Sequence, residues 1–230
     1  MLPRRSFLSR LGVGVPALAG VAGAGSMAPA LQAAAASPWK PARHAQDDWL
    51  DRVPGKHRLL FDTTTAEGFG QALLYVNNFL GQNRSAYNLQ DADLAVVIVA
   101  RHHSTPYALN DAMWAKYGAG LTQLTGFNDP NTKQPPAANV YNSPAYGAAL
   151  LNRGVMLDSL LKRGVQLAVC EIGTYTAASM IAPGAGGDVA AINAELTRNC
   201  LANTHMVSAG IVTINRAQER GYTFAYAAGV

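Results

Sequence analysis

The sequence predicts an α/β fold with a mainly parallel sheet of about five strands. The first observation is that short apolar runs alternate along the chain with longer segments of helical period. The second is that one run, residues 94–100, is apolar at every position, as expected of a central strand covered on both faces. Strands that alternate with helices in this way favour parallel pairing.

Each further element has its own sequence signature. The other strands are expected at residues 58–62, 165–170, 205–209 and 222–226. The last of these suits an edge, because its aromatic side chains alternate. The helices are expected at residues 66–80, 106–117, 144–163, 188–201 and 211–220, and residues 173–182 are expected to form a short helix or turn. Thr105 and Asp188 are typical N-cap residues. The glycines expected to end helices are Gly118, Gly164 and Gly221.

Two segments do not belong to this alternating pattern. Residues 37–55 are polar and contain three prolines, which indicates a linker or an arm lying on the main domain, residues 56–230. Residues 119–143 have no clear period, and a loop of this length is either functional or mobile. We expect this second segment to be an insertion that lies over the site as a lid.

Residues 1–36 have the features of a twin-arginine signal peptide. Arg4 and Arg5 precede a weakly apolar run rich in alanine and glycine, which argues against a strong membrane span. We therefore expect a protein that is periplasmic or otherwise exported by the twin-arginine route, with an uncleaved membrane anchor as the alternative. Loss of the three leader arginines leaves 15 basic against 14 acidic residues, a net charge of +1. This balance does not favour a nucleic-acid or membrane-surface partner.

The residues that can carry chemistry fall where predicted strands end. In a parallel sheet these carboxyl ends share one edge, and ligands bind there. The residues expected at this edge are Thr63, His102, His103, Cys170, Glu171, Ser208 and Gly210, with Tyr175 as a pocket wall. Their shared placement, rather than any one of them, predicts a site.

Cys170 is the best nucleophile in this set. A helix N-terminus or a protonated histidine nearby would favour the reactive thiolate. His102 and His103 are adjacent, so they should point to opposite sides if the backbone is still extended there, and one can serve the thiol as proton donor or acceptor. The alternative is a buried cysteine that acts only as a small hydrophobic side chain.

A disulfide and a metal site are both disfavoured by the predicted layout. Cys170 ends a strand and Cys200 lies near the far end of the following helix, about 20 Å away, whereas a disulfide needs Cα atoms within roughly 7 Å. A zinc site needs three or four convergent ligands, and no close-spaced ligand motif is present. The glycine loop at residues 184–187 matches neither phosphate-binding pattern. We expect free thiols, no metal and no cofactor.

Three segments resemble the DsrE/DsrF-like family. They are residues 207–212 followed by 216–222, the segment from Gly164 to Cys170, and the strand from Val97 that ends in the two histidines. The resemblance extends from Lys56 to the C-terminus, with residues 119–143 unmatched. It implies a three-layer α/β/α fold, homo-oligomers such as trimers and hexamers, and sulfur relay by a cysteine that carries sulfur as a persulfide. Cys170 matches the position of that cysteine.

The sequence thus predicts an exported DsrE-like protein that binds or relays a small sulfur species through Cys170, as a sulfurtransferase-like carrier. Its expected partner is a small sulfur compound or a sulfur-carrying protein. Thr63, Ser208 and backbone N–H groups are expected to steady the anion. A non-catalytic periplasmic binding or assembly protein with a structural cysteine is the alternative, and a metal-binding protein is a third reading.

Overall fold

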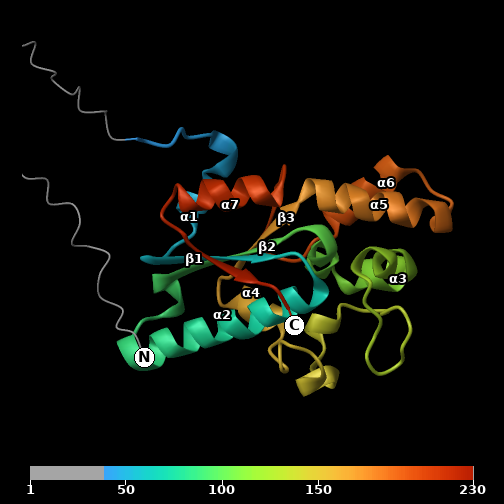
Figure 1. Cartoon of the computed structure of the whole chain (residues 1–230), viewed down its shortest axis with the longest axis horizontal. Coiled ribbons are helices and arrows are strands. Elements are labelled where there is room, and N and C mark those ends of the chain that lie inside the picture. Colours follow the sequence, from blue (N-terminus) through green and yellow to red (C-terminus); the bar gives the residue numbers. More distant parts are fainter. Residues whose placement is uncertain (1–38, 230) are drawn as a thin grey trace, which may run out of the picture. The chain divides into compact units, whose positions relative to one another are not determined.

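Five parallel strands form a single sheet in the order β4-β3-β2-β1-β5 (Figure 1). The strands are β1 (His57–Thr63), β2 (Leu94–Ala100), β3 (Gln166–Cys170), β4 (Thr204–Val207) and β5 (Thr223–Ala227). The computed structural model describes residues 39–229, and the predicted signal peptide lies outside them. β2 is central and buried at every position, which confirms the prediction from its unbroken apolar run.

Helices cover both faces of the sheet in the unit that runs from Pro41 onward. The α-helices are α1 (Trp49–Arg52), α2 (Ala66–Tyr87), α3 (Asp111–Thr125), α4 (Leu157–Lys162), α5 (Glu171–Ala185), α6 (Val189–Arg198) and α7 (Gly210–Gln218). Figure 1 shows α1 and α7 on one side of the sheet and α2 and α4 on the other. The fold is therefore the expected three-layer α/β/α arrangement with a parallel sheet.

The direction of each connection decides which face its helices cover. The connections from β1 through β4 each step to the next strand in one direction, and right-handed crossovers place their helices on one face. The connection from β4 to β5 runs back across the sheet, so α7 lies on the opposite face, where it packs over β1, β2, β3 and β5. The connections that leave β3 and β4, which are neighbours in the sheet, therefore run to opposite faces.

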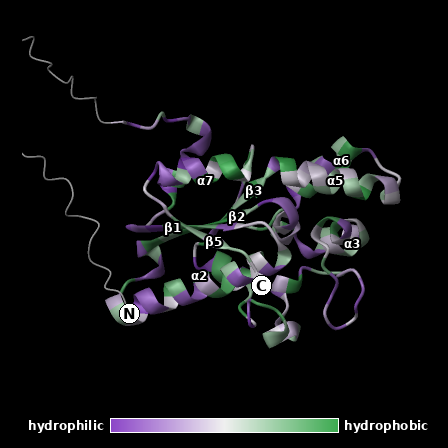
Figure 2. Cartoon of the chain, in the orientation of Figure 1, coloured by the Kyte–Doolittle hydropathy of each residue, from purple (hydrophilic) through white to green (hydrophobic). Residues whose placement is uncertain are grey.

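The sheet separates two cores, because successive side chains of a strand point to opposite faces. Val96 and Ile98 of β2 face the larger core, which contains the buried side of α2. Val97 and Val99 face the smaller core, with Leu50 of α1 among its members. Figure 2 shows hydrophobic and hydrophilic segments alternating along α2 and α7, as expected of helices with one face against a sheet.

The second connection, from β2 to β3, begins differently from the prediction. Residues 102–108 form the 3₁₀ helix η3 (His102–Ala108), and α3 starts only at Asp111. Its N-cap is Asn110, whose Oδ1 accepts a hydrogen bond from Met113 N at 3.2 Å. Thr105 is instead buried in η3. The predicted N-cap at Thr105 is wrong because the chain makes one more tight turn before the helix begins.

Gly118 does not end α3, which continues to Thr125 and stops at the left-handed Gly126 (φ 67°). A Cβ on Gly118 would lie 2.4 Å from the carbonyl oxygen of Pro136. The glycine therefore serves a close backbone approach rather than a helix end.

The predicted helix over residues 144–163 is also interrupted. It consists of the 3₁₀ helix η5 (Pro144–Ala149), a turn with left-handed residues at Arg153 and Gly154, and the short helix α4. Helix α5, in contrast, is longer than predicted and passes through Pro183 to end at the left-handed Gly186. Asp188 caps α6 as predicted, accepting a hydrogen bond from Ala191 N at 2.9 Å. The remaining 3₁₀ helices are η1 (Ala45–Asp47), η2 (Asp91–Asp93) and η4 (Val140–Asn142).

The segment before β1 packs as an arm on the α7 face. The Trp49 ring stacks on His205 of β4, with ring centroids 3.9 Å apart and planes within 9°. The Tyr222 hydroxyl donates a hydrogen bond to the Leu50 carbonyl at 2.8 Å, and Arg220 pairs with Asp51 at 3.2 Å. Residues 45–53 are therefore part of the folded unit rather than a free linker.

Candidate functional site

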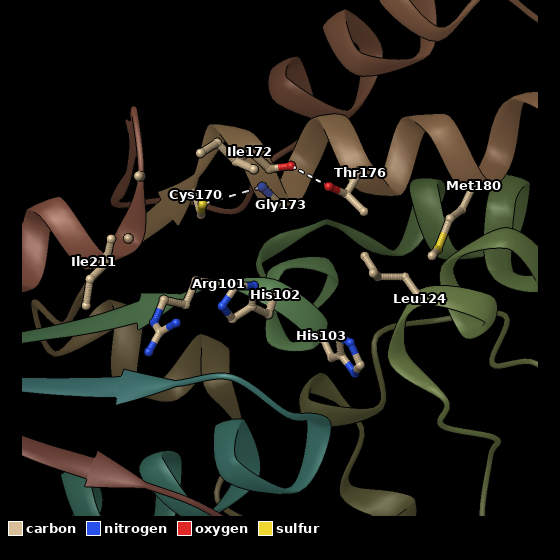
Figure 3. A pocket seen from close by; sticks show the side chains of 12 residues that line it. Arg101, His102, His103, Leu124, Cys170, Ile172, Gly173, Thr176, Met180 and Ile211 are labelled. Carbon is tan, nitrogen blue, oxygen red and sulfur yellow. Dashed lines mark hydrogen bonds between the residues drawn. The ribbon is translucent and has the colours of Figure 1, made fainter.

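A pocket of about 260 Å³ lies at the carboxyl edge of the sheet, where the connections that follow β3 and β4 diverge to opposite faces. Figure 3 shows residues of α5 on one wall and the turn after β2 on the other. The lining residues are Arg101, His102, His103, Leu124, Cys170, Ile172, Gly173, Thr176, Met180, Ala209, Gly210 and Ile211. All of them except Leu124, which belongs to α3, lie at or after the carboxyl ends of β2, β3 and β4.

Cys170 is both the last residue of β3 and the N-cap of α5. Its Sγ accepts a hydrogen bond from the backbone N–H of Gly173, with an N···S distance of 3.4 Å (Figure 3). The residue is 6% exposed and lines the pocket. The N-terminus of a 15-residue helix favours negative charge, so this position suits an anionic sulfur.

The first turn of α5 can approach η3 only because residue 173 is glycine. A Cβ at this position would lie 2.3 Å from Oγ1 of Thr105. That hydroxyl is buried and has no hydrogen-bond partner among the described residues. Gly173 thus brings the helix N-terminus, and with it the Cys170 sulfur, close to the turn that carries the histidines.

His102 and His103 begin η3 and lie on the wall opposite Cys170 (Figure 3). Both side chains are exposed at the pocket surface. His102 has a left-handed backbone (φ 53°), which is uncommon for a non-glycine residue and often marks a functional site. His103 N donates a hydrogen bond to the Thr64 carbonyl at 3.1 Å, which ties the turn to the end of β1.

Arg101 also lines the pocket, but its guanidinium is paired. Nε and Nη2 bind the two carboxylate oxygens of Asp62 at 2.7 and 2.8 Å, and Asp62 is 3% exposed. The bond to Asp62 raises the pKa of Arg101, so the guanidinium stays charged. A Cβ on Gly210 would lie 2.9 Å from the Arg101 side chain, so this glycine makes room for the arginine. Figure 3 shows the guanidinium turned away from Cys170.

Four of the predicted site residues line this pocket: Cys170, His102, His103 and Gly210. Glu171 and Ser208 lie outside it, in two neighbouring clefts of about 400 and 650 Å³, and Tyr175 lines the larger one. Thr63 is fully buried and donates to the Val99 carbonyl at 2.7 Å, so it braces the strands and cannot act as an anion donor. The prediction for Thr63 is corrected accordingly.

The predicted lid does not cover the pocket. Of residues 119–143, only Leu124 lines it. The end of the segment is held against η3 and α2. Asn139 Nδ2 donates to the carbonyls of Tyr107 and Leu109 at 2.7 and 3.0 Å, and the Tyr141 hydroxyl donates to the Ala66 carbonyl at 2.6 Å. The insertion is therefore anchored away from the pocket through its buried end, residues 139–141.

The sequence reasoning missed the apolar wall of the pocket. Ile172, Thr176 and Met180 lie four residues apart on α5, on one face of the helix, and all three line the pocket. Helical spacing from Cys170 could have identified this face. Leu124 and Ile211 come from distant segments, and no local signal places them here.

Cys200 provides an internal comparison for Cys170. Both cysteines are free, but Cys200 packs against Met206, with its Sγ 3.9 Å from the thioether sulfur. Burial raises the pKa of Cys200 to about 11, which disfavours its thiolate at neutral pH.

No group of three or more His, Cys, Asp or Glu side chains that could hold a metal ion occurs within residues 39–229. Over the same residues, none of the helices combines the length and the apolar character needed to span a bilayer.

Comparison with known proteins adds little to this description. No protein-family model and no curated protein matches the chain. A solved structure of a protein of unknown function from Methanobacterium thermoautotrophicum is similar at 15% identity with a TM-score of 0.35. The alignment covers 74% of this chain and 99% of that one.

Proposed function

We propose that this chain is an exported DsrE-like protein that binds or relays a small sulfur species through Cys170. One observation carries the proposal: the Cys170 sulfur lines a pocket at the N-terminus of α5, opposite His102 and His103. A thiolate is the form that accepts sulfane sulfur, and a helix N-terminus favours it.

Each group in the pocket has a role in this proposal. The Gly173 N–H, which already donates to the Cys170 sulfur, would steady the anionic thiolate or persulfide. An imidazole of His102 or His103 would accept the thiol proton and return it to the leaving group. The apolar side chains of Ile172, Met180 and Ile211 would limit water around the loaded sulfur.

Mass spectrometry of the reduced full chain after exposure to polysulfide or thiosulfate tests this proposal. We expect a sulfur adduct on the wild-type protein and on Cys200→Ser, and its loss in Cys170→Ser. Cys200→Ser is the matched control, because it removes a thiol that packs against Met206 instead of lining the pocket. An adduct of equal yield in Cys170→Ser would refute sulfur relay at this site.

A second function is favoured by the low exposure of Cys170, which is 6%. In this alternative the pocket binds a small molecule without covalent chemistry, and the sulfur acts as a capping acceptor for α5. The measurement that separates the two is the rate of alkylation by iodoacetamide in the folded protein. Alkylation of Cys170 no faster than that of Cys200 would favour the structural role.

Export and assembly belong to the same proposal. We place the protein in the periplasm or outside the cell as a homo-oligomer, with a small sulfur compound or a sulfur-carrying protein as its partner. Replacing Arg4 and Arg5 by Lys should retain the precursor in the cytoplasm, as fractionation would show. Light scattering of the purified protein should give a mass that is a multiple of the monomer's, and a monomer would contradict the assembly.

A further inference from the structure

The walls of the Cys170 pocket are mostly apolar apart from Arg101, Thr176 and the two histidines. Leu124, Ile172, Met180 and Ile211 supply the large side chains, and the lining residues within the described part of the chain include no Lys, Asp or Glu. Arg101 is the one arginine among these lining residues, and it is engaged with Asp62 through two hydrogen bonds. An inorganic anion would therefore lose its hydration without gaining an unpaired guanidinium or ammonium group from the described lining residues.

The size of the pocket also exceeds that of an inorganic sulfur species. A volume of 260 Å³ corresponds to roughly nine water molecules at their liquid volume. Thiosulfate has five heavy atoms, so it would leave much of the apolar wall in contact with water. The pocket suits a ligand with an organic body.

The direction of that body follows from α5. Ile172 and Met180 both line the pocket and are separated by two turns of the helix, a distance of about 12 Å. Figure 3 shows Cys170 and Ile211 toward one end, with Met180 and Leu124 toward the other. Ile172, Met180 and Ile211 are 63%, 39% and 60% exposed, so apolar surface at the mouth is left for a ligand to cover.

We propose that the substrate is an organic persulfide, R–S–SH, whose apolar group R lies along α5 toward Met180 and Leu124 while its terminal sulfur meets Cys170. This inference rests on the proposed function and specifies its substrate class. It excludes thiosulfate and inorganic polysulfide as the preferred donors.

The transfer step balances without any further reactant. The Cys170 thiolate attacks the terminal sulfur of R–S–SH, a new S–S bond forms at Cys170 Sγ, and the donor's S–S bond breaks with its electron pair leaving on R–S⁻. The proton lost by the Cys170 thiol reaches R–S⁻ through an imidazole or water. R–SH leaves and Cys170–S–SH remains.

A homologous series of thiol reagents tests the pocket independently of sulfur transfer. Methyl, propyl and pentyl methanethiosulfonates place the group R on a cysteine and release methanesulfinate. We expect the rate constant at Cys170 of the full chain, relative to that of free cysteine, to rise roughly two- to fourfold per added methylene. The anionic 2-sulfonatoethyl reagent should react at least about tenfold more slowly than the propyl reagent.

Met180→Gln should flatten this dependence on chain length, because it puts an amide where the end of R lies. Met156→Gln, the same change at a methionine outside the pocket, should leave the dependence intact. A flat series in the wild-type protein, or a sulfonate reagent as fast as the propyl one, overturns the inference. Equal slopes in the two methionine variants overturn the proposed direction of R.

A second arm separates this inference from the proposed function. Sulfur adducts on Cys170 are compared after exposure to phenylethyl persulfide, generated in place, and to thiosulfate. A faster adduct from the organic donor supports both claims. Equal amounts of adduct from the two donors would support sulfur relay and overturn the claim that the substrate is organic. A chain-length preference with no sulfur adduct from either donor would overturn sulfur relay and support binding of an apolar ligand. A Cys170 that reacts with none of the reagents overturns both.

Discussion

His102 combines a left-handed backbone with a place opposite the Cys170 thiol. A non-glycine residue in this conformation costs on the order of 1 kcal/mol, so the surroundings must hold it there. The Ser104 hydroxyl does so by bonding the backbone N–H and carbonyl of Arg101 at 3.0 and 2.9 Å, while Asp62 fixes the Arg101 side chain. The neighbouring hydrogen bonds thus hold a strained residue whose imidazole lines the pocket.

Replacing His102 by Gly should therefore separate stability from reactivity. We expect the free energy of unfolding to stay level or to rise by up to about 1 kcal/mol, because glycine adopts the left-handed backbone without strain. Sulfur transfer to Cys170 should fall. Urea unfolding and adduct formation measure the two effects, and His102→Asn, which also tolerates this backbone, is the control. A loss of stability in His102→Gly would mean that the imidazole supports the fold.

Gly173 offers a second test at the residue scale. Gly173→Ala should destabilise the protein by about 1–3 kcal/mol, since the new methyl group would overlap the Thr105 hydroxyl. Thr105→Ala removes that hydroxyl, so the double variant should recover part of the loss. A double-mutant cycle by urea unfolding gives the coupling energy. Additive effects of the two changes would contradict the proposed contact.

At the scale of elements, the strands were predictable and several helices were not. β2 was predicted at its observed bounds, because a central strand needs only an unbroken apolar run. Gly118 misled the prediction of α3, since only the fold reveals that Pro136 passes over it. The residues of α5 that line the pocket could have been predicted from their helical spacing. Leu124 could not, because it reaches the pocket only through the packing of α3 on α5. Long-range packing of this kind leaves no local pattern in the sequence.

A buried amide helps to anchor the segment from residue 126 to residue 143. Asn139 is 1% exposed, and its side chain bonds the Tyr107 and Leu109 carbonyls. Asn139→Ala leaves these acceptors unsatisfied, and we expect a loss of about 2–3 kcal/mol by urea unfolding. Asn131→Ala, at an exposed position of the same segment, should change stability by less than about 0.5 kcal/mol. Equal effects would show that the segment does not rely on this anchor.

At the scale of the whole molecule, the arm and β4 are joined across the α7 face by the stacked Trp49 and His205. Burial and the nearby Arg52 lower the pKa of His205, so the folded state favours the neutral imidazole. The neutral His205 therefore contributes its full stabilisation at pH values above about 6.5, the pKa of histidine in the unfolded chain. This stabilisation is lost as the pH falls from about 6.5 toward the lower pKa of His205 in the folded state.

His205→Gln should therefore weaken the dependence of stability on pH. Between pH 7.5 and pH 5, the wild-type protein should lose more free energy of unfolding than the variant, as urea titrations at each pH would show. His57→Gln, at an exposed position, is the control and should keep the wild-type pH dependence. An unchanged dependence in His205→Gln would mean that the Trp49 ring stabilises the imidazolium enough to offset its burial.

The pairing of β5 with β1 has a consequence for the chain while it is being made. Thr223 bonds the carbonyl of Arg58, a residue 165 positions earlier. At roughly 5–20 residues per second, the outer edge of β1 waits on the order of ten to thirty seconds at the ribosome before its neighbour emerges. During this interval the unpaired edge of β1 can form β-sheet hydrogen bonds with other chains. A chaperone that covers this edge should therefore have its greatest effect before β5 emerges.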